Sequence, residues 1–84
     1  MNWAVEFTVT ARREILKLDS SLRKQLEEDL YELSQVPLCG KQLHGRLAGV
    51  RSWRSGDYRI LYGIQTTAAA LIVYRVAHRR EVYR

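Results

Sequence analysis

The last eight residues of the chain, AHRREVYR at 77–84, hold the side chains best suited to chemistry on a charged group. They follow an apolar run, ALIVY at 70–74, that predicts a buried strand. The planar guanidinium group of arginine can donate two hydrogen bonds at once to a phosphate. Histidine is the side chain that titrates near neutral pH. The segment therefore predicts a site that holds an anion, and a phosphodiester is the natural candidate.

The sequence offers no motif for metal or cofactor chemistry. It contains no glycine-rich phosphate loop, no HExxH pattern, no Ser-His-Asp set and no cluster of Cys and His. We therefore expect no metal and no cofactor, so arginine must stabilise the charge of the transition state. Arg stays protonated at neutral pH and Tyr has an ordinary pKa near 10, so both carry protons poorly there. His78 is the one nearby side chain that titrates conveniently, although a strand-end histidine bonded to the backbone is an equally good interpretation.

RNA suits such a site better than DNA because its 2′-OH supplies an internal nucleophile. The protein then needs only to align that hydroxyl for in-line attack on the adjacent phosphate and to help the 5′-oxygen leave. Base stacking would come from exposed aromatic side chains, for which Trp53 and Tyr83 are the candidates. The alternative is a place in the core for Trp53 and a role as anchor of the tail for Tyr83.

Charge is divided unevenly along the 84 residues. Residues 1–37 hold five Lys and Arg against seven Asp and Glu, whereas residues 38–84 hold nine against two. Eight of those nine cations are arginine, so the net charge of +5 comes from the C-terminal half. This segregation favours a polyanionic partner over a basic surface kept only for solubility.

These side chains need a scaffold, and the spacing of apolar residues predicts one. Apolar residues at alternate positions over 3–9 predict a strand with one buried face. Thr10 is expected to cap a short helix over 11–18. Leucines at spacings of four, four and three from Leu22 to Leu33 predict an amphipathic helix, which Pro37 ends. The two helices should form a hairpin with one apolar seam.

Residues 37–49, PLCGKQLHGRLAG, carry three glycines and predict an exposed connection. Three strands should follow, joined by turns at Gly56-Asp57 and at 65–67 into an antiparallel meander. The order along the chain is β-α-α-β-β-β, an α+β fold in which the helical hairpin packs on one face of a small antiparallel sheet. We expect residues 1–84 to form a single domain of this kind.

Strand alternation predicts which side chains share a face of this sheet. On the strand over 58–64, Arg59 points away from Ile60, and on the last strand Arg75 and Arg79 point away from Ile72. If the helices cover the face of the two isoleucines, the three arginines emerge together on the uncovered face. The predicted face is therefore strongly basic.

Such a cluster of like charges destabilises a fold unless an anion occupies it. The neighbouring strand can add Arg51 or Arg54 to the cluster. Further candidates for contact with phosphate or RNA are Lys41, Arg46 and Arg80.

Three motifs follow one another in the C-terminal half: LHGRLAG at 43–49, RSGDYRILY at 54–62 and HRREVY at 78–83. Together they resemble the RelE branch of the RelE/ParE toxin superfamily. The segment VEFTVTARREILKLDSSLRKQLEEDLYEL at 5–33 also fits the strand and helical hairpin of that family. The resemblance covers essentially the whole chain. It implies the toxin of a type II toxin–antitoxin pair, a ribosome-dependent endoribonuclease that cleaves the mRNA codon in the A site by attack of the 2′-OH.

The resemblance also implies roles for individual residues. Arg59 matches the strand arginine that contacts the scissile phosphate. Arg79, or the adjacent Arg80, matches the arginine that stabilises or protonates the leaving group, and Tyr83 matches the terminal tyrosine that stacks on the nucleotide or orients it. The two lysines that the best-studied members carry before the glycine turn are absent from VRSWRSG at 50–56. Either His78 acts as the base, or the ribosome and the substrate geometry do more of the catalysis.

The resemblance implies partners as well. They are the ribosome, mRNA and an acidic, partly disordered antitoxin of the RelB type that covers the basic site in a hetero-oligomer. Two alternatives share the fold: a ParE-like inhibitor of DNA gyrase and a catalytically inactive nucleic-acid-binding relative. No apolar stretch reaches the roughly 20 residues of a membrane span, so we expect no membrane contact and a cytoplasmic protein. The single cysteine, Cys39, excludes an internal disulfide.

Overall fold

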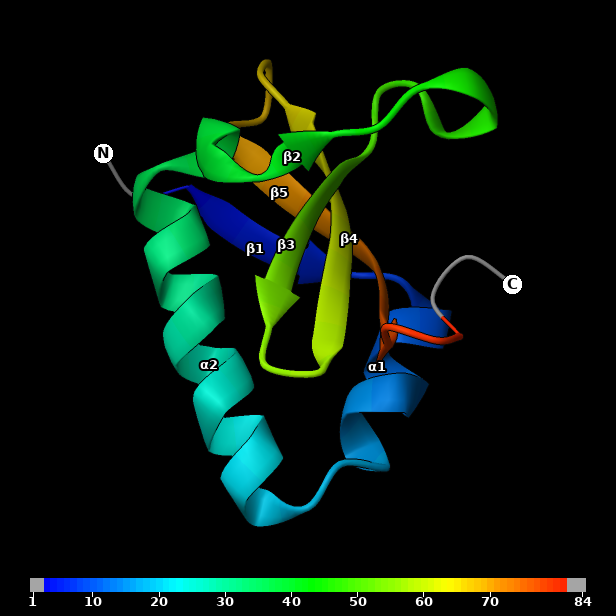
Figure 1. Ribbon diagram of the computed structural model, residues 1–84. Coiled ribbons are helices and arrows are strands. Elements are labelled where there is room, and N and C mark those ends of the chain that lie inside the picture. The colour runs from blue at the N-terminus through cyan, green and yellow to red at the C-terminus, as the bar shows by residue number, and fades with distance from the viewer. Residues whose placement is uncertain (1–2, 82–84) are drawn as a thin grey trace.

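The computed structural model describes residues 3–81 (Figure 1). Its strands and helices in chain order are β1 Ala4–Phe7, α1 Val9–Leu16, α2 Ser20–Gln35, β2 Lys41–Gln42, β3 Arg51–Ser55, β4 Tyr58–Gln65 and β5 Ala70–His78. Short 3-10 turns at Pro37–Cys39 and Gly45–Leu47 lie on either side of β2. The predicted α+β class is confirmed. Among the described residues, no helix is long and apolar enough to cross a membrane.

The five strands form one sheet in the order β1-β5-β4-β3-β2. The predicted meander of β3, β4 and β5 is antiparallel, whereas β1 pairs with β5 in parallel. Strand β2 was not predicted. It pairs two residues with β3, and two residues are too few to show any alternation.

The starts of the helices are set by side-chain caps. The hydroxyl of Thr8 accepts the backbone N–H of Ala11 at 3.1 Å, so α1 begins two residues earlier than expected and the predicted cap at Thr10 is wrong. The first strand is correspondingly shorter than predicted. Helix α2 begins at a cap formed by Asp19, whose carboxylate accepts the N–H of Leu22 at 2.9 Å. It ends at Gln35, two residues before Pro37, as the sequence predicts.

The main core lies between the helical hairpin and one face of the sheet. Figure 1 shows α1 and α2 joined at the bottom of the view and diverging along the sheet. The buried residues of this core are Ala11, Leu18, Leu26, Leu30, Leu33, Ile60, Tyr62, Leu71, Val73 and Val76. On the opposite face Leu61 and Ala77 form a second small cluster, against which Leu43 and Val50 pack. Most residues of the connection over 37–49 are exposed, as the sequence predicts, and its Leu43 covers part of that face.

A β-bulge divides β5 into two halves. In the register with β4, Leu61 lies opposite Arg75 but Tyr62 lies opposite Val73, so Tyr74 is an extra residue. The face of β5 that meets the helices is therefore made by Leu71 and Val73 before the bulge and by Val76 after it. The prediction that Ile72 faces the helices is wrong, because one inserted residue inverts the alternation.

Candidate nucleic-acid interface

Arg54, Arg59 and the backbone of Arg79 lie close to the turn between β3 and β4. Arg54 on β3 lies directly opposite Arg59 on β4. The turn is tight because Gly56 adopts a φ of +60°, a conformation that side chains disfavour. Arg54 closes it by donating its Nε to the carbonyl of Gly56 at 2.9 Å. The backbone N–H of Arg79 donates to the carbonyl of Asp57 at 2.8 Å, which brings the chain after β5 to the same turn.

Arg59 lies on the face of the sheet that points away from the helices. It is opposite Ala77, which belongs to the small cluster on that face. Its guanidinium group reaches Ser52, with 3.4 Å between Nη1 and the hydroxyl oxygen, and the arginine is half-buried. Alternation along β4 placed this arginine correctly, because β4 pairs regularly with β3 on both sides of it.

Arg75 was expected to join this cluster, but the structure uses it elsewhere. It lies opposite Leu61, on the predicted face, yet its guanidinium group turns to α1. There it forms an ion pair with Glu14, with Nη2 at 2.8 Å and Nε at 3.0 Å from Oε2. The hydrogen bonds to Glu14 raise the pKa of Arg75 above its ordinary value. Its charge is therefore partly neutralised.

Arg51 also has a structural use. It lies opposite Tyr62, on the helix-facing side of the sheet, and donates to the carbonyls of Leu38 and Gly40 at 3.1 and 2.9 Å. The phenol of Tyr62 accepts the N–H of Gly40 at 3.0 Å and donates to the carbonyl of Pro37 at 2.7 Å. Burial raises the pKa of this phenol. Arg51 and Tyr62 together fix the connection that follows α2, and the structure does not bring Arg51 to Arg59.

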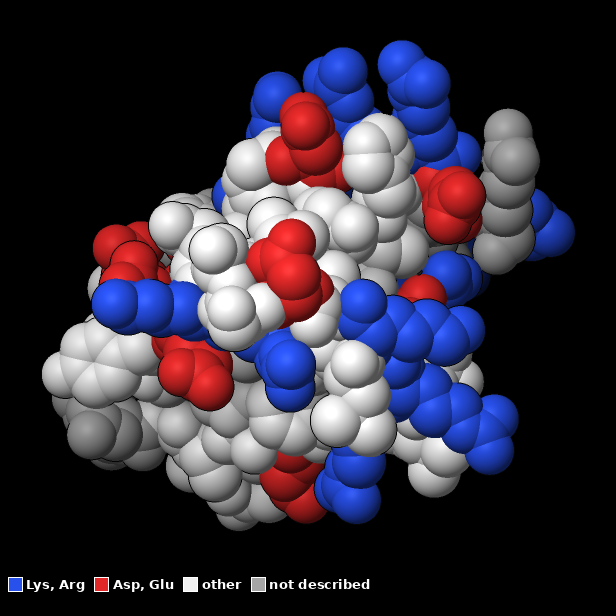
Figure 2. All heavy atoms as spheres, turned by 90° about the horizontal axis from the view of Figure 1, so that it is seen from below, with Lys and Arg blue, Asp and Glu red and all other residues white. Residues whose placement is uncertain are grey.

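The remaining predicted phosphate contacts are dispersed. Lys41 on β2 and Arg46 in the Gly45–Leu47 turn are exposed. Both segments lie at the top of Figure 1, whereas the β3–β4 turn lies at the lower end of the sheet. Arg80 is exposed next to Arg79, and its backbone N–H donates to Nδ1 of His78 at 3.2 Å. Figure 2, a view from below, shows Lys and Arg side chains along the upper and right margins, with isolated acidic side chains among them.

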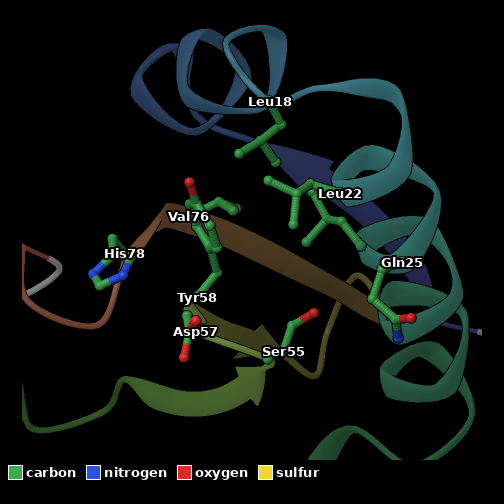
Figure 3. Close-up of a pocket in the computed structure, with 10 residues that line it drawn as sticks. Leu18, Leu22, Gln25, Ser55, Asp57, Tyr58, Val76 and His78 are labelled. Carbon is green, nitrogen blue, oxygen red and sulfur yellow. The ribbon is translucent and has the colours of Figure 1, made fainter.

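His78 lies on the helix-facing side, away from Arg59. It is opposite Tyr58, and the two rings meet edge to face with centroids 5.7 Å apart. Both line a cavity of about 270 Å³ between the helices and the β3–β4 turn, with Leu22 and Gln25 across from them (Figure 3). Because Nδ1 accepts the N–H of Arg80, the neutral ring carries its proton on Nε2. This geometry fits the interpretation of a strand-end histidine bonded to the backbone.

Of the two aromatic side chains predicted to stack on bases, only Trp53 lies within the described residues. Trp53 lies opposite Ile60 and packs against the main core, which fits the interpretation as a core residue. Its Nε1 is buried, and within the described part of the chain it has no hydrogen-bond partner. Tyr83 lies outside the described residues. The structure therefore offers no support for Trp53 as an exposed stacking surface.

Sequence reasoning missed the contact that fixes the β3–β4 turn to α2. Asp29 is buried, and its Oδ2 accepts the hydroxyl of Ser55 and, at 3.4 Å, the side-chain amide of Gln25. Ser55 is the last residue of β3 and neighbours Arg54. The one signal was an aspartate beside the leucine stripe of α2, and an aspartate there is more often solvated. Within residues 3–81, no three His, Cys, Asp or Glu side chains lie so as to hold a metal ion.

The comparisons with known proteins agree on one family. A family model described as the ParE toxin of the type II toxin–antitoxin system parDE matches residues 5–83. The chain is similar to toxin RelG of Mycobacterium tuberculosis, at 41% identity over all of this chain and 99% of that protein. It is also similar to toxin RelE of the same organism, at 30% identity over 95% of this chain and 84% of that one.

Solved structures show the same fold. The toxin–antitoxin complex RelBE2 of M. tuberculosis contains a chain that matches with a TM-score of 0.88 and 38% identity, over 96% of this chain and 95% of that one. The isolated RelE toxin of E. coli matches with a TM-score of 0.77 and 26% identity, over 90% of this chain and 83% of that one.

Proposed function

This chain belongs to the RelE/ParE toxin superfamily and is the toxin of a type II toxin–antitoxin system, and from that premise we propose that it is a ribosome-dependent endoribonuclease that cleaves mRNA. The observation that carries the proposal is the pair of Arg54 and Arg59 at the β3–β4 turn, to which Arg79 is bonded through its backbone. Two guanidinium groups on opposed strand positions form a site for a phosphate.

In the proposed reaction, Arg59 holds the scissile phosphate on the face away from the helices. The 2′-oxygen of the preceding ribose forms a bond to phosphorus, and the bond from phosphorus to the 5′-oxygen breaks. The products are a 2′,3′-cyclic phosphate and a 5′-hydroxyl, and the proton lost by the 2′-OH is balanced by the one that the 5′-oxygen gains. Arg79 stabilises the charge that develops on the leaving oxygen, and Tyr83 orients the nucleotide.

In the proposed reaction, a general base of the protein contributes little to the rate of cleavage. The segment before the β3–β4 turn holds arginines in place of lysines, and an arginine stays protonated at neutral pH and does not accept a proton. His78 faces the helices, on the side of the sheet away from Arg59. Alignment of the 2′-OH on the ribosome, together with arginine charge, then supplies most of the catalysis.

The proposed partner of the toxin in the cell is a cognate acidic antitoxin. The similar structures include toxin–antitoxin complexes with RelB from M. tuberculosis and E. coli. An acidic segment that folds as it binds would mask the arginines of the β3–β4 turn and form a hetero-oligomer with the toxin.

A second function shares the fold, since the matching family model is described as a ParE toxin. In that alternative the basic face contacts DNA gyrase and cleaves nothing. The curated relatives with the RelG and RelE names favour the nuclease.

Primer extension on a reporter mRNA in a reconstituted bacterial translation system tests the proposal. The wild type, Arg59→Ala and the matched control Arg13→Ala, an exposed arginine of α1, are run with and without ribosomes. Breaks within A-site codons that require ribosomes, vanish with Arg59→Ala and persist with Arg13→Ala would support the nuclease. Intact mRNA in every lane, with inhibition of gyrase supercoiling by the same protein, would overturn it in favour of the alternative.

A further inference from the structure

The edge of β5 is covered by a strand over only half its length. Strand β1 pairs with Ala70–Val73, and the edge beyond Val73 has no neighbouring strand within the described residues. Backbone groups on such an edge need other partners, or they remain open to solvent and to incorrect pairing. The first of these partners is Thr8, whose backbone N–H donates to the carbonyl of Val73 and whose hydroxyl donates to that of Tyr74, both at 3.0 Å.

The second partner is Glu14, one side chain that binds both the backbone and a side chain of β5. Its Oε1 accepts the backbone N–H of Val76 at 2.8 Å. Its Oε2 accepts Nη2 of Arg75 at 2.8 Å and Nε at 3.0 Å. Bonds of an ionised carboxylate to N–H donors are about twice as strong as neutral ones. Only 18% of the Glu14 side chain is exposed, so solvent screens these bonds little.

These bonds fall on the two residues directly after the bulge at Tyr74. The bulge decides which side chains of the following segment face the helices, because a shift of one residue would invert them all. In the observed phase, Ala77 lies beside Arg59 and the N–H of Arg79 reaches the β3–β4 turn. The carboxylate of Glu14 therefore binds β5 directly after the bulge, at the residues that decide which side chains of the following segment face the helices.

We propose that Glu14 is a positioning residue for the anion site: it binds Arg75 and the backbone of Val76, and so fixes the register of the segment that carries Arg79. This inference rests on the proposed nuclease function for its effect on cleavage. Glu14 itself touches neither phosphate nor leaving group. It acts through the strand, and it also withholds the charge of Arg75 from the RNA.

Two substitutions of Glu14 separate positioning from charge. Glu14→Gln keeps an oxygen that can accept the N–H of Val76 but loses the ion pair, whereas Glu14→Ala loses both. Glu28→Ala, which removes an exposed glutamate of α2, is the matched control. We expect ribosome-dependent cleavage to fall about 10- to 100-fold with Glu14→Ala, as misplacement of catalytic groups by about 1 Å produces. Glu14→Gln should recover most of that loss, and Glu28→Ala should cleave like the wild type.

A readout independent of cleavage accompanies each variant. Hydrogen exchange of the Val76 amide should accelerate in Glu14→Ala and not in Glu28→Ala, while exchange of the α2 amides stays at the wild-type rate. An RNA trinucleotide with a 2′-deoxy sugar at the cleavage position, titrated into labelled protein, should bind about tenfold more weakly to Glu14→Ala. This measurement remains valid if the wild type cleaves nothing, so failure of the nuclease proposal is distinguishable from failure of this one.

The inference is overturned if Glu14→Ala binds the trinucleotide like the wild type although its Val76 amide exchanges faster. It is also overturned if that amide is unaffected. If Glu14→Ala does not fold, Arg75→Met provides the second variant, since it leaves the bond between Glu14 and Val76 available. If Arg75→Met bound the trinucleotide more weakly than Glu14→Gln, the ion pair would matter more than the bond to Val76. That result would contradict positioning through the backbone of Val76.

Discussion

Arg54 on β3 and Arg59 on β4 lie directly opposite each other at the turn that Gly56 and Asp57 make. Like charges at opposed positions of two strands lower the stability of a sheet. The same two strands carry residues of the main core on their other face. This repulsion lies at the proposed functional site, and functional sites are where proteins commonly keep locally unfavourable interactions. Binding of an anion between the two guanidinium groups would convert the repulsion into attraction.

The first prediction concerns Arg54→Gln. Removing one of the two opposed charges should raise the free energy of unfolding by about 0.2–1 kcal/mol at low salt, less whatever the lost bond to the carbonyl of Gly56 contributes. The gain should nearly vanish at about 1 M salt, where charges are screened over about 3 Å. Urea unfolding at low and high salt measures both values, with Arg13→Gln as control. A stability difference between the variant and the wild type that is the same at low and at high salt would contradict the repulsion.

The second prediction concerns the bond between Ser55 and the buried Asp29. Ser55→Ala leaves the carboxylate of Asp29 with the amide of Gln25 as its partner within residues 3–81 and should destabilise the fold by about 1–3 kcal/mol. Ser21→Ala, the same change at an exposed position of α2, should stay within about 0.5 kcal/mol of the wild type. Equal urea midpoints for the two variants would show that the contact contributes nothing.

The third prediction compares two leucines of α2. Leu33 is fully buried, whereas Leu22 is 37% exposed and lines the same cavity as His78. Leu33→Ala should cost about 2–5 kcal/mol because it leaves a void that the core cannot fill, and Leu22→Ala should cost clearly less. Thermal unfolding followed by circular dichroism compares them directly. A smaller loss for Leu33→Ala would mean that the core can collapse around the missing side chain.

The sequence predicted those elements whose pattern is local and long. Helix α2 was predicted with its end near Pro37 because leucines repeat at helical spacing and proline stops a helix. Strand β4 was predicted, and Arg59 was assigned to the correct face because its strand pairs without interruption around it. Strand β2 has only two residues, and Thr8 and Thr10 are equally good caps in sequence, so neither β2 nor the start of α1 could be predicted.

The rest of the candidate site depended on contacts between distant residues. Nothing in the alternation of β5 distinguishes Tyr74 as a bulged residue, so the phase of the strand after it could not be predicted. Glu14 and Arg75 are 61 residues apart, and their pairing follows only once α1 is placed beside β5. Arg51 was grouped with Arg54 because both precede the turn, but its position opposite Tyr62 directs it to the connection after α2.

The fourth prediction concerns Tyr62 and alkaline pH. Burial raises the pKa of this phenol in the folded state, so its contribution to stability is complete below the ordinary value near 10 and is lost as the pH rises through the folded-state value. Tyr62→Phe removes the bonds to Gly40 and Pro37 and should cost about 1–3 kcal/mol at neutral pH. The difference between wild type and variant should then narrow above about pH 10. Urea unfolding of both proteins at a series of pH values measures it, and a constant difference would contradict the linkage.

The fifth prediction separates the two sides of the sheet in the proposed reaction. His78 packs on Tyr58 beside the helices, whereas Arg59 faces the opposite side, next to Ala77. A histidine that acted as general base would have to reach a nucleophile aligned on the other face. We therefore expect His78→Ala to retain cleavage within about tenfold of the wild type, while Arg59→Ala loses it by about 100-fold or more.

Single-turnover cleavage of ribosome-bound mRNA as a function of pH provides the measurement. If alignment and arginine charge carry the reaction, the wild type and His78→Ala should show parallel pH profiles across the neutral range. An inflection that the wild type shows and His78→Ala lacks, together with a loss of cleavage as large as that of Arg59→Ala, would instead make His78 the base. It would also require the end of β5 to leave the position in which Nδ1 accepts the N–H of Arg80.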